Sequence, residues 1–284
     1  MHKILIAILI LFGSKHAVSV GADSSFMKLS LYEDTLKGLA VSMITDDDLS
    51  IRQNSCYEFI RTLVKAIRIE NSYSYPFDSL YGLISIISPK DNKFRIFSWE
   101  LFRFDLTFRY YGCIQMKNGK ALEFYPLFDN SSHAKDPETS TVSSEKWYGA
   151  YYYNIIQKKR GKKRYYCLFG FNEHNLLSNK KILDVLYFEE GVPYFGLAVF
   201  EYPDKNKVVK RLIIEYKNDA SATLNYNKEW GIIVYDHLIP LNPLQEGMYE
   251  FYVPDGSYEG FKYKKGKWHY INKVFDQTFE EPPF

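Results

Sequence analysis

The stretch 147–171 constrains the fold more than any other part of the sequence. Two aromatic-rich runs, 147–156 and 165–171, flank a basic segment that contains Gly161, and neither run holds a proline. Aromatic and β-branched residues around a glycine-containing turn are typical of a β-hairpin. Because neither face of the first run is plainly polar, we expect both faces to be covered and the hairpin to lie centrally rather than at an edge.

The rest of the chain predicts an α+β fold that is mostly β. A helix is expected over 27–44, and a second follows the acidic run 46–48, where Phe59, Leu63 and Ile67 recur at helical spacing. From about residue 84 the pattern changes to short β runs with glycine at many turns. We therefore predict an N-terminal helical pair packed on a long antiparallel β-meander that is barrel-, sandwich- or propeller-like.

The N-terminal segment 1–22 has the pattern of an export signal. Lys3 precedes a short apolar run, and Val20 and Ala22 suit cleavage after residue 22. The expected organisation is thus a signal peptide over 1–22, a helical region over 23–90 and a β-meander domain over 91–284. The predicted location is exported, either periplasmic or associated with an outer membrane, with no transmembrane span after signal removal.

Net charge argues against one class of partner, and the cysteine count argues against a disulfide framework. Removing Lys3 and Lys15 from 36 basic residues leaves 34, which equals the 34 acidic residues. A neutral mature chain does not predict binding to nucleic acid. The three cysteines, Cys56, Cys113 and Cys167, cannot all pair within one chain, and we expect no structural disulfide.

Several segments resemble an uncharacterised family of exported proteins from Bacteroidetes-type bacteria. The resemblance covers residues from about 90 to the C-terminus. It implies a bacterial exported protein and supplies no activity and no site residues. The segments that carry it are FRIFSW at 94–99, YGCIQ at 111–115, KWYGA at 146–150, KILDV at 181–185, DHLIP at 236–240 and YVPDGSY at 252–258.

The sequence contains no recognisable catalytic or metal-binding motif. The G-x-S-x-G elbow, the Walker loop, H-E-x-x-H and clustered Cys/His spacing are all missing from it. Asp236 and His237 form the closest acid–histidine pair in sequence, but neighbours along a strand point to opposite faces. We predict no cofactor and no metal, and the catalytic residues are unknown.

Strand alternation gives a hypothesis for binding sites, because the turns of a meander alternate between two ends of the sheet. One end is expected to be basic and to contact anions, through Lys158, Lys159, Arg160, Lys162, Lys163 and Arg164. The other end is expected to gather polar groups that suit a ligand such as a sugar, namely Glu173, His174, Asp204, Glu229, Trp230 and Asp255.

Three functions are compatible with these patterns. The first is an exported non-catalytic binding or scaffold protein of the bacterial envelope, and it is favoured because catalytic motifs are missing. The second is a glycan-acting hydrolase with a carboxylate pair such as Glu173 and Glu229, which would need a separation of roughly 5–10 Å. The third is an envelope protein whose basic hairpin tip contacts anionic lipid. The partner is unknown at this point, and a glycan or another envelope component is the candidate.

Overall fold

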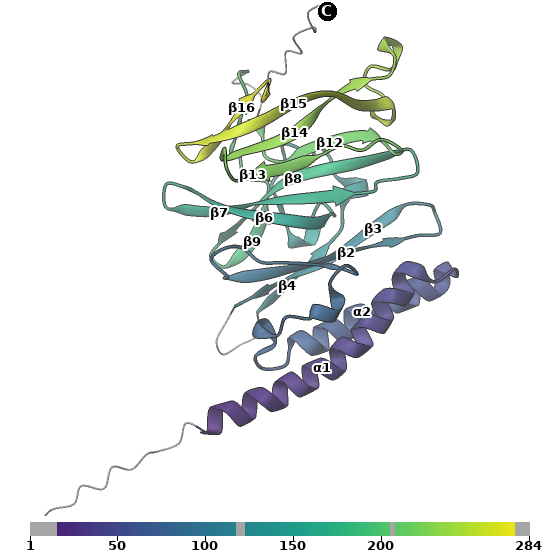
Figure 1. Cartoon of the computed structure of the whole chain (residues 1–284), viewed down its shortest axis with the longest axis vertical. Coiled ribbons are helices and arrows are strands. Elements are labelled where there is room, and N and C mark those ends of the chain that lie inside the picture. The colour runs from purple at the N-terminus through teal and green to yellow at the C-terminus, as the bar shows by residue number, and fades with distance from the viewer. Residues whose placement is uncertain (1–15, 118–122, 205–207, 276–284) are drawn as a thin grey trace, which may run out of the picture.

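The computed structural model describes residues 16–117, 123–204 and 208–275, and its side chains from residue 24 onward (Figure 1). Two helices come first, α1 (His16–Thr45) and α2 (Leu49–Ile67). The acidic run separates them as predicted, and the Asp48 carboxylate caps α2 by accepting the N–H of Ser50 at 2.7 Å. The helix α1 starts earlier than the predicted residue 27 and passes through the expected cleavage position. Residues 1–15 of the predicted signal lie outside the described residues.

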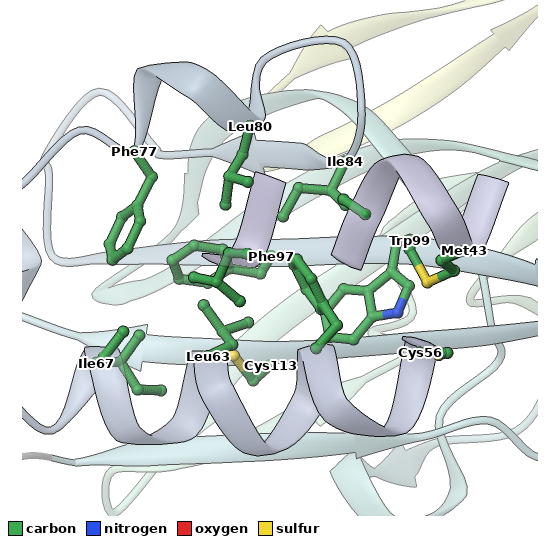
Figure 2. Packing of buried hydrophobic residues seen from close by; sticks show 14 of the residues in the cluster. Met43, Cys56, Leu63, Ile67, Phe77, Leu80, Ile84, Phe97, Trp99 and Cys113 are labelled. Atoms are coloured by element: carbon green, nitrogen blue, oxygen red, sulfur yellow. The ribbon is translucent and has the colours of Figure 1, made fainter. Parts of the chain in front are cut away.

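Four strands form the first sheet, in the order β1-β2-β3-β4. Residues 94–102 and 108–116 pair as a regular hairpin because apolar and aromatic residues dominate both runs. The helices cover one face of this sheet, and Figure 2 shows Cys56, Leu63 and Ile67 of α2 facing Phe97, Trp99 and Cys113. The bounds are β1 (Ser85–Ile87), β2 (Phe94–Phe102), β3 (Phe108–Met116) and β4 (Phe124–Phe128), with short 3-10 helices η1 (Ser72–Ser74) and η2 (Asp78–Leu80) before them.

The second and third sheets lie on the far side of the first sheet from the helices (Figure 1). The second has the order β5-β9-β8-β7-β6, with β12 also paired to β8. Its strands are β5 (Val142–Ser143), β6 (Tyr151–Arg160), β7 (Lys163–Asn172), β8 (Ser178–Glu189), β9 (Val192–Phe195) and β12 (Leu212–Lys217).

The third sheet has the order β11-β10-β16-β15-β14-β13. Its pairs are antiparallel except for β10 and β16, which run parallel. Its strands are β10 (Phe200–Glu201), β11 (Val208–Val209), β13 (Leu224–Asn227), β14 (Ile232–Pro240), β15 (Tyr252–Lys264) and β16 (Lys267–Ile271). Short 3-10 helices complete the chain, namely η3 (Ser131–His133), η4 (Ser144–Lys146), η5 (Pro243–Gln245) and η6 (Tyr249–Phe251).

The predicted fold class is confirmed as α+β, mostly β and sandwich-like. The orders of the described strands are open and form no closed barrel. Three clusters of buried side chains lie between the layers. The cluster under the helices includes Phe77, Leu80 and Phe97, so it spans the predicted region boundary at residue 90. The three cysteines are free and buried in the structure.

The predicted hairpin is present as β6 and β7, with Gly161 in the turn at φ 58°. Two details differ from the prediction. The first strand begins at Tyr151 rather than at residue 147, and β6 lies at the edge of its sheet rather than at its centre. The edge is nonetheless covered by the first sheet. Ser98 Oγ accepts the N–H of Tyr152 at 3.0 Å, and Ser85 Oγ donates to the carbonyl of Tyr152.

Candidate functional site

A groove of about 670 Å³ lies beside β10 and β16, and we call it the β10–β16 groove. Parallel pairing aligns Phe200 with Trp268 and Glu201 with His269, so polar side chains of both strands meet at its floor. The tip of the β6–β7 hairpin reaches it through Arg160, whose Nη1 donates to the carbonyl of Ala198 at 3.0 Å. The groove residues used below are Arg160, Glu201, Tyr202, Asp204, Lys267, His269 and Tyr270.

Glu201 is the electrostatic centre of this groove. Lys267 Nζ donates to its carboxylate, and His269 Nδ1 lies 3.2 Å from Glu201 Oε2. The hydrogen bond from Lys267 lowers the pKa of Glu201, and the charges of Lys267 and His269 lower it further. Glu201 is therefore an anion whose orientation two neighbours fix.

Stacked aromatic rings form a wall of the groove. The rings of Tyr202 and Tyr270 lie 4.9 Å apart with an interplanar angle of 28°. The hydroxyl of Tyr270 donates to Glu259 at 2.6 Å, which fixes this ring from behind. Rigid rings beside oriented polar groups are the usual elements of a small-molecule site.

The polar residues predicted to gather at one end lie in separate places. Asp204 lines the β10–β16 groove. His174 lies 3.7 Å from Glu215, next to Glu173 after β7. Asp255 pairs across strands with His237 at 2.9 Å, whereas Asp236 accepts the N–H of Thr223. In the turn before β14, Glu229 and Trp230 are exposed, and the Trp230 ring packs on Phe275 at 4.9 Å.

The separation has a topological cause. The turn that holds Glu229 and Trp230 lies at the end opposite to the predicted one. Asn218 at the β12–β13 turn donates its N–H to the carbonyl of Leu177, beside the β7–β8 turn. Tyr226, just before the β13–β14 turn, contacts Lys158 near the tip of the β6–β7 hairpin. The chain between β9 and β12 crosses from one sheet to another, and this crossing breaks the simple alternation of turns.

The carboxylates Glu173 and Glu229 therefore do not form a pair. Glu173 follows the end of β7 that pairs with Tyr151, whereas Glu229 follows Tyr226, which contacts Lys158. Tyr151 and Lys158 are separated by roughly 20 Å along one strand at about 3.3 Å per residue. This exceeds the roughly 5–10 Å that a glycosidase mechanism requires.

Strand alternation also distributes the cations of the hairpin tip. Lys158 lies over the rings of Tyr226, Tyr263 and Trp268 at 5.1, 4.8 and 5.3 Å. The other cations face different neighbours. Arg160 lines the groove, Lys163 pairs with Glu189 at 2.5 Å, and Arg164 pairs with Asp91 at 3.1 Å. Lys159 and Lys162 are exposed.

A half-buried acid was not identified from the sequence. Glu100 on β2 accepts a hydrogen bond from Tyr110, whose hydroxyl oxygen in turn accepts the N–H of Glu173 at 2.7 Å. Burial and the nearby charge of Glu173 raise the pKa of Glu100 to about 7. The sequence contained a signal, because Glu100 shares one strand face with the buried Phe94, Ile96 and Ser98.

Within 16–117, 123–204 and 208–275, no cluster of histidine, cysteine and acidic residues could hold a metal ion. Over those residues no helix is both long and apolar enough to cross a membrane. Fold and groove together define an α+β, sandwich-like protein with a polar, aromatic-walled groove. Comparison with models of known families, with curated proteins and with solved structures finds no match. The resemblance to an exported bacterial family therefore stays a prediction.

Proposed function

We propose that this chain is an exported, non-catalytic binding protein that holds a saccharide in the β10–β16 groove. The observation that carries the proposal is the combination of oriented charged groups with the stacked Tyr202 and Tyr270 rings around one hollow. Carboxylates and guanidinium groups hydrogen-bond to hydroxyl groups, and aromatic rings pack on the apolar faces of a sugar ring.

Charge balance favours an uncharged ligand over an ion. Arg160 and Lys267 contribute two positive charges, while Glu201 and Asp204 contribute two negative charges. These four charges cancel one another. A groove that presents both signs offers many hydrogen bonds without attracting an ion of either charge strongly.

Titration calorimetry against a panel of neutral mono- and oligosaccharides tests the proposal. We expect binding of at least one saccharide, and Asp204→Ala or His269→Ala to weaken it by about tenfold, which corresponds to roughly 1.4 kcal/mol. Glu229→Ala is the matched control, because it removes an exposed acid outside the groove. No binding across the panel, or equal losses in the control and the groove variants, would refute a saccharide site here.

Export is part of the proposal and has its own test. The motivating feature is the signal-like pattern of residues 1–22. Intact mass spectrometry of the protein from its native host should give a chain that begins after Ala22. A mature protein that retains Lys3 would contradict export by cleavage.

A further inference from the structure

Arg95 on β2 is a buried cation that neutral groups surround. Its side chain is only 4% exposed. Nε donates to Gln115 Oε1, and Nη1 and Nη2 donate to the carbonyls of Tyr75 and Ser72, each at 2.7 Å. The guanidinium carbon also lies 4.8–5.5 Å from the ring centres of three aromatic residues, Tyr73, Phe77 and Phe97.

These contacts leave the positive charge without a counter-charge. Among the residues that the structure describes, no aspartate or glutamate forms an ion pair with Arg95. Asp91 lies in the same region but pairs with Arg164 at 3.1 Å and accepts the hydroxyl of Tyr166 at 2.9 Å. Burial lowers the pKa of Arg95 to about 10, so the group stays charged at neutral pH. Buried charges are normally paired, and an unpaired one is costly.

Arg95 borders a hollow of about 470 Å³ that carries a second cation. Lys117 Nζ lies 5.8 Å from the centre of the Tyr73 ring, the same ring that Arg95 contacts. Ser74, Ser88 and Asn92 add hydroxyl and amide donors to the lining. Pro76 and Ile86 add an apolar surface on the same hollow. Guanidinium, ammonium and hydroxyl donors around one space match the geometry of an oxyanion.

We propose that this hollow, the Arg95 pocket, binds a phosphate monoester of a small organic group. The oxyanion would be held by Arg95 and Lys117, and the organic group would pack against Pro76 and Ile86. The volume exceeds what a single phosphate needs, and the apolar wall explains why an ester fits better than the inorganic ion. This site is separate from the β10–β16 groove, and it requires an anionic ligand where the groove suits an uncharged one.

Calorimetric titration with phenyl phosphate, inorganic phosphate and benzoate tests the proposal at constant ionic strength. Phenyl phosphate should bind more tightly than inorganic phosphate and than benzoate, which carries the same ring on a carboxylate. Lys117→Ala should weaken phenyl phosphate by about tenfold. Lys159→Ala is the matched control, because this exposed lysine lies on the hairpin tip away from the pocket. Because Lys117 is exposed, its replacement should leave the fold intact, so a weaker affinity reports on the pocket.

The outcomes separate the possibilities. Absence of phenyl phosphate binding, or equal affinities for Lys117→Ala and the parent, would overturn the site and leave Arg95 as a packing residue. Tighter binding of benzoate would overturn the assignment to a phosphate. Vesicles of phosphatidylcholine with and without phosphatidic acid distinguish the source of the monoester: Lys117-dependent binding to phosphatidic acid vesicles identifies a lipid headgroup, and binding of phenyl phosphate alone identifies a soluble ester.

Discussion

The protein compensates the positive charges of two buried arginines, Arg211 and Arg95, in different ways. Arg211 Nε lies 2.9 Å from the carboxylate of Asp184, and these two side chains are 1% and 0% exposed. Burial lowers the pKa of Arg211, but the charge of Asp184 outweighs burial, so the pKa is raised on balance. Arg95 has only carbonyls, an amide and aromatic rings, and its pKa falls to about 10. An ion cancels a buried charge, whereas dipoles only solvate it.

The difference indicates separate roles for the two residues. Arg211 also donates from Nη1 to the carbonyl of Pro137, so it fixes the segment after η3 to the second sheet. Its site is closed. Arg95 fixes the segment around η1 in a similar way, but it also borders an open hollow. We therefore expect Arg211 to contribute to stability alone and Arg95 to contribute to stability and to ligand binding.

The largest expected effect comes from breaking the Arg211 pair on one side. Asp184→Ala leaves a buried guanidinium without its anion, and we expect a loss of roughly 3–5 kcal/mol in the free energy of unfolding. Urea denaturation measures it. The double variant Asp184→Ala with Arg211→Met is the control, because it removes both charges and should recover much of the loss. A loss under about 1 kcal/mol in the single variant would show that the pair is not compensating a buried charge.

Removing Arg95 should cost less. Arg95→Met deletes three hydrogen bonds but leaves no charge behind, and we expect a loss of roughly 2–3 kcal/mol in urea denaturation. Addition of phenyl phosphate should stabilise the parent and leave Arg95→Met unchanged, which a purely structural arginine does not predict. If Arg95→Met were more destabilising than Asp184→Ala, the two sites would not differ as described.

Part of the fold, but not the β10–β16 groove, could be predicted from the sequence. The β6–β7 hairpin, the two helices and the α+β class follow from local periodicity and turn chemistry, which involve residues close in sequence. The strand 94–102 also carried an unused signal, because Arg95 alternates with Phe97 and Trp99 on one apolar face. The β10–β16 groove could not be predicted, because it depends on parallel pairing of Phe200 with Trp268 and on a crossing between sheets. Asp204 was the one predicted ligand residue that lies there.

Glu100 is the acidic counterpart of Arg95, because no cation among the described residues lowers its pKa. Its pKa is about 7 in the folded state and near 4.5 in the unfolded chain, so the folded state holds the proton between these pH values. Stability from this group is therefore fully present below about pH 4.5 and is lost as the pH rises to 7. Glu100→Gln mimics the protonated form. It should be more stable than the parent at pH 8 by about 3 kcal/mol and equally stable at pH 4.5.

The control for Glu100 is Glu229→Gln, which changes an exposed acid in the β13–β14 turn. Its free energy of unfolding, measured by urea denaturation, should equal that of the parent at each of the two pH values. A Glu100→Gln variant with the same stability as the parent at pH 8 would mean that this acid ionises normally in the folded protein.

The smallest expected effect concerns Lys158, whose ammonium is compensated by aromatic rings. It lies within 5.3 Å of three ring centres and donates to the hydroxyl of Tyr226 at 3.2 Å. A cation over aromatic rings contributes roughly 0.5–2 kcal/mol, so Lys158→Ser should lower stability by about 1 kcal/mol. Lys159→Ser, at the exposed neighbour on the same strand, should stay within about 0.5 kcal/mol of the parent. Urea denaturation of both variants measures the difference. Equal effects at the two positions would show that the rings do not stabilise the Lys158 charge. Aromatic rings alone would then not compensate a partly buried cation in this protein.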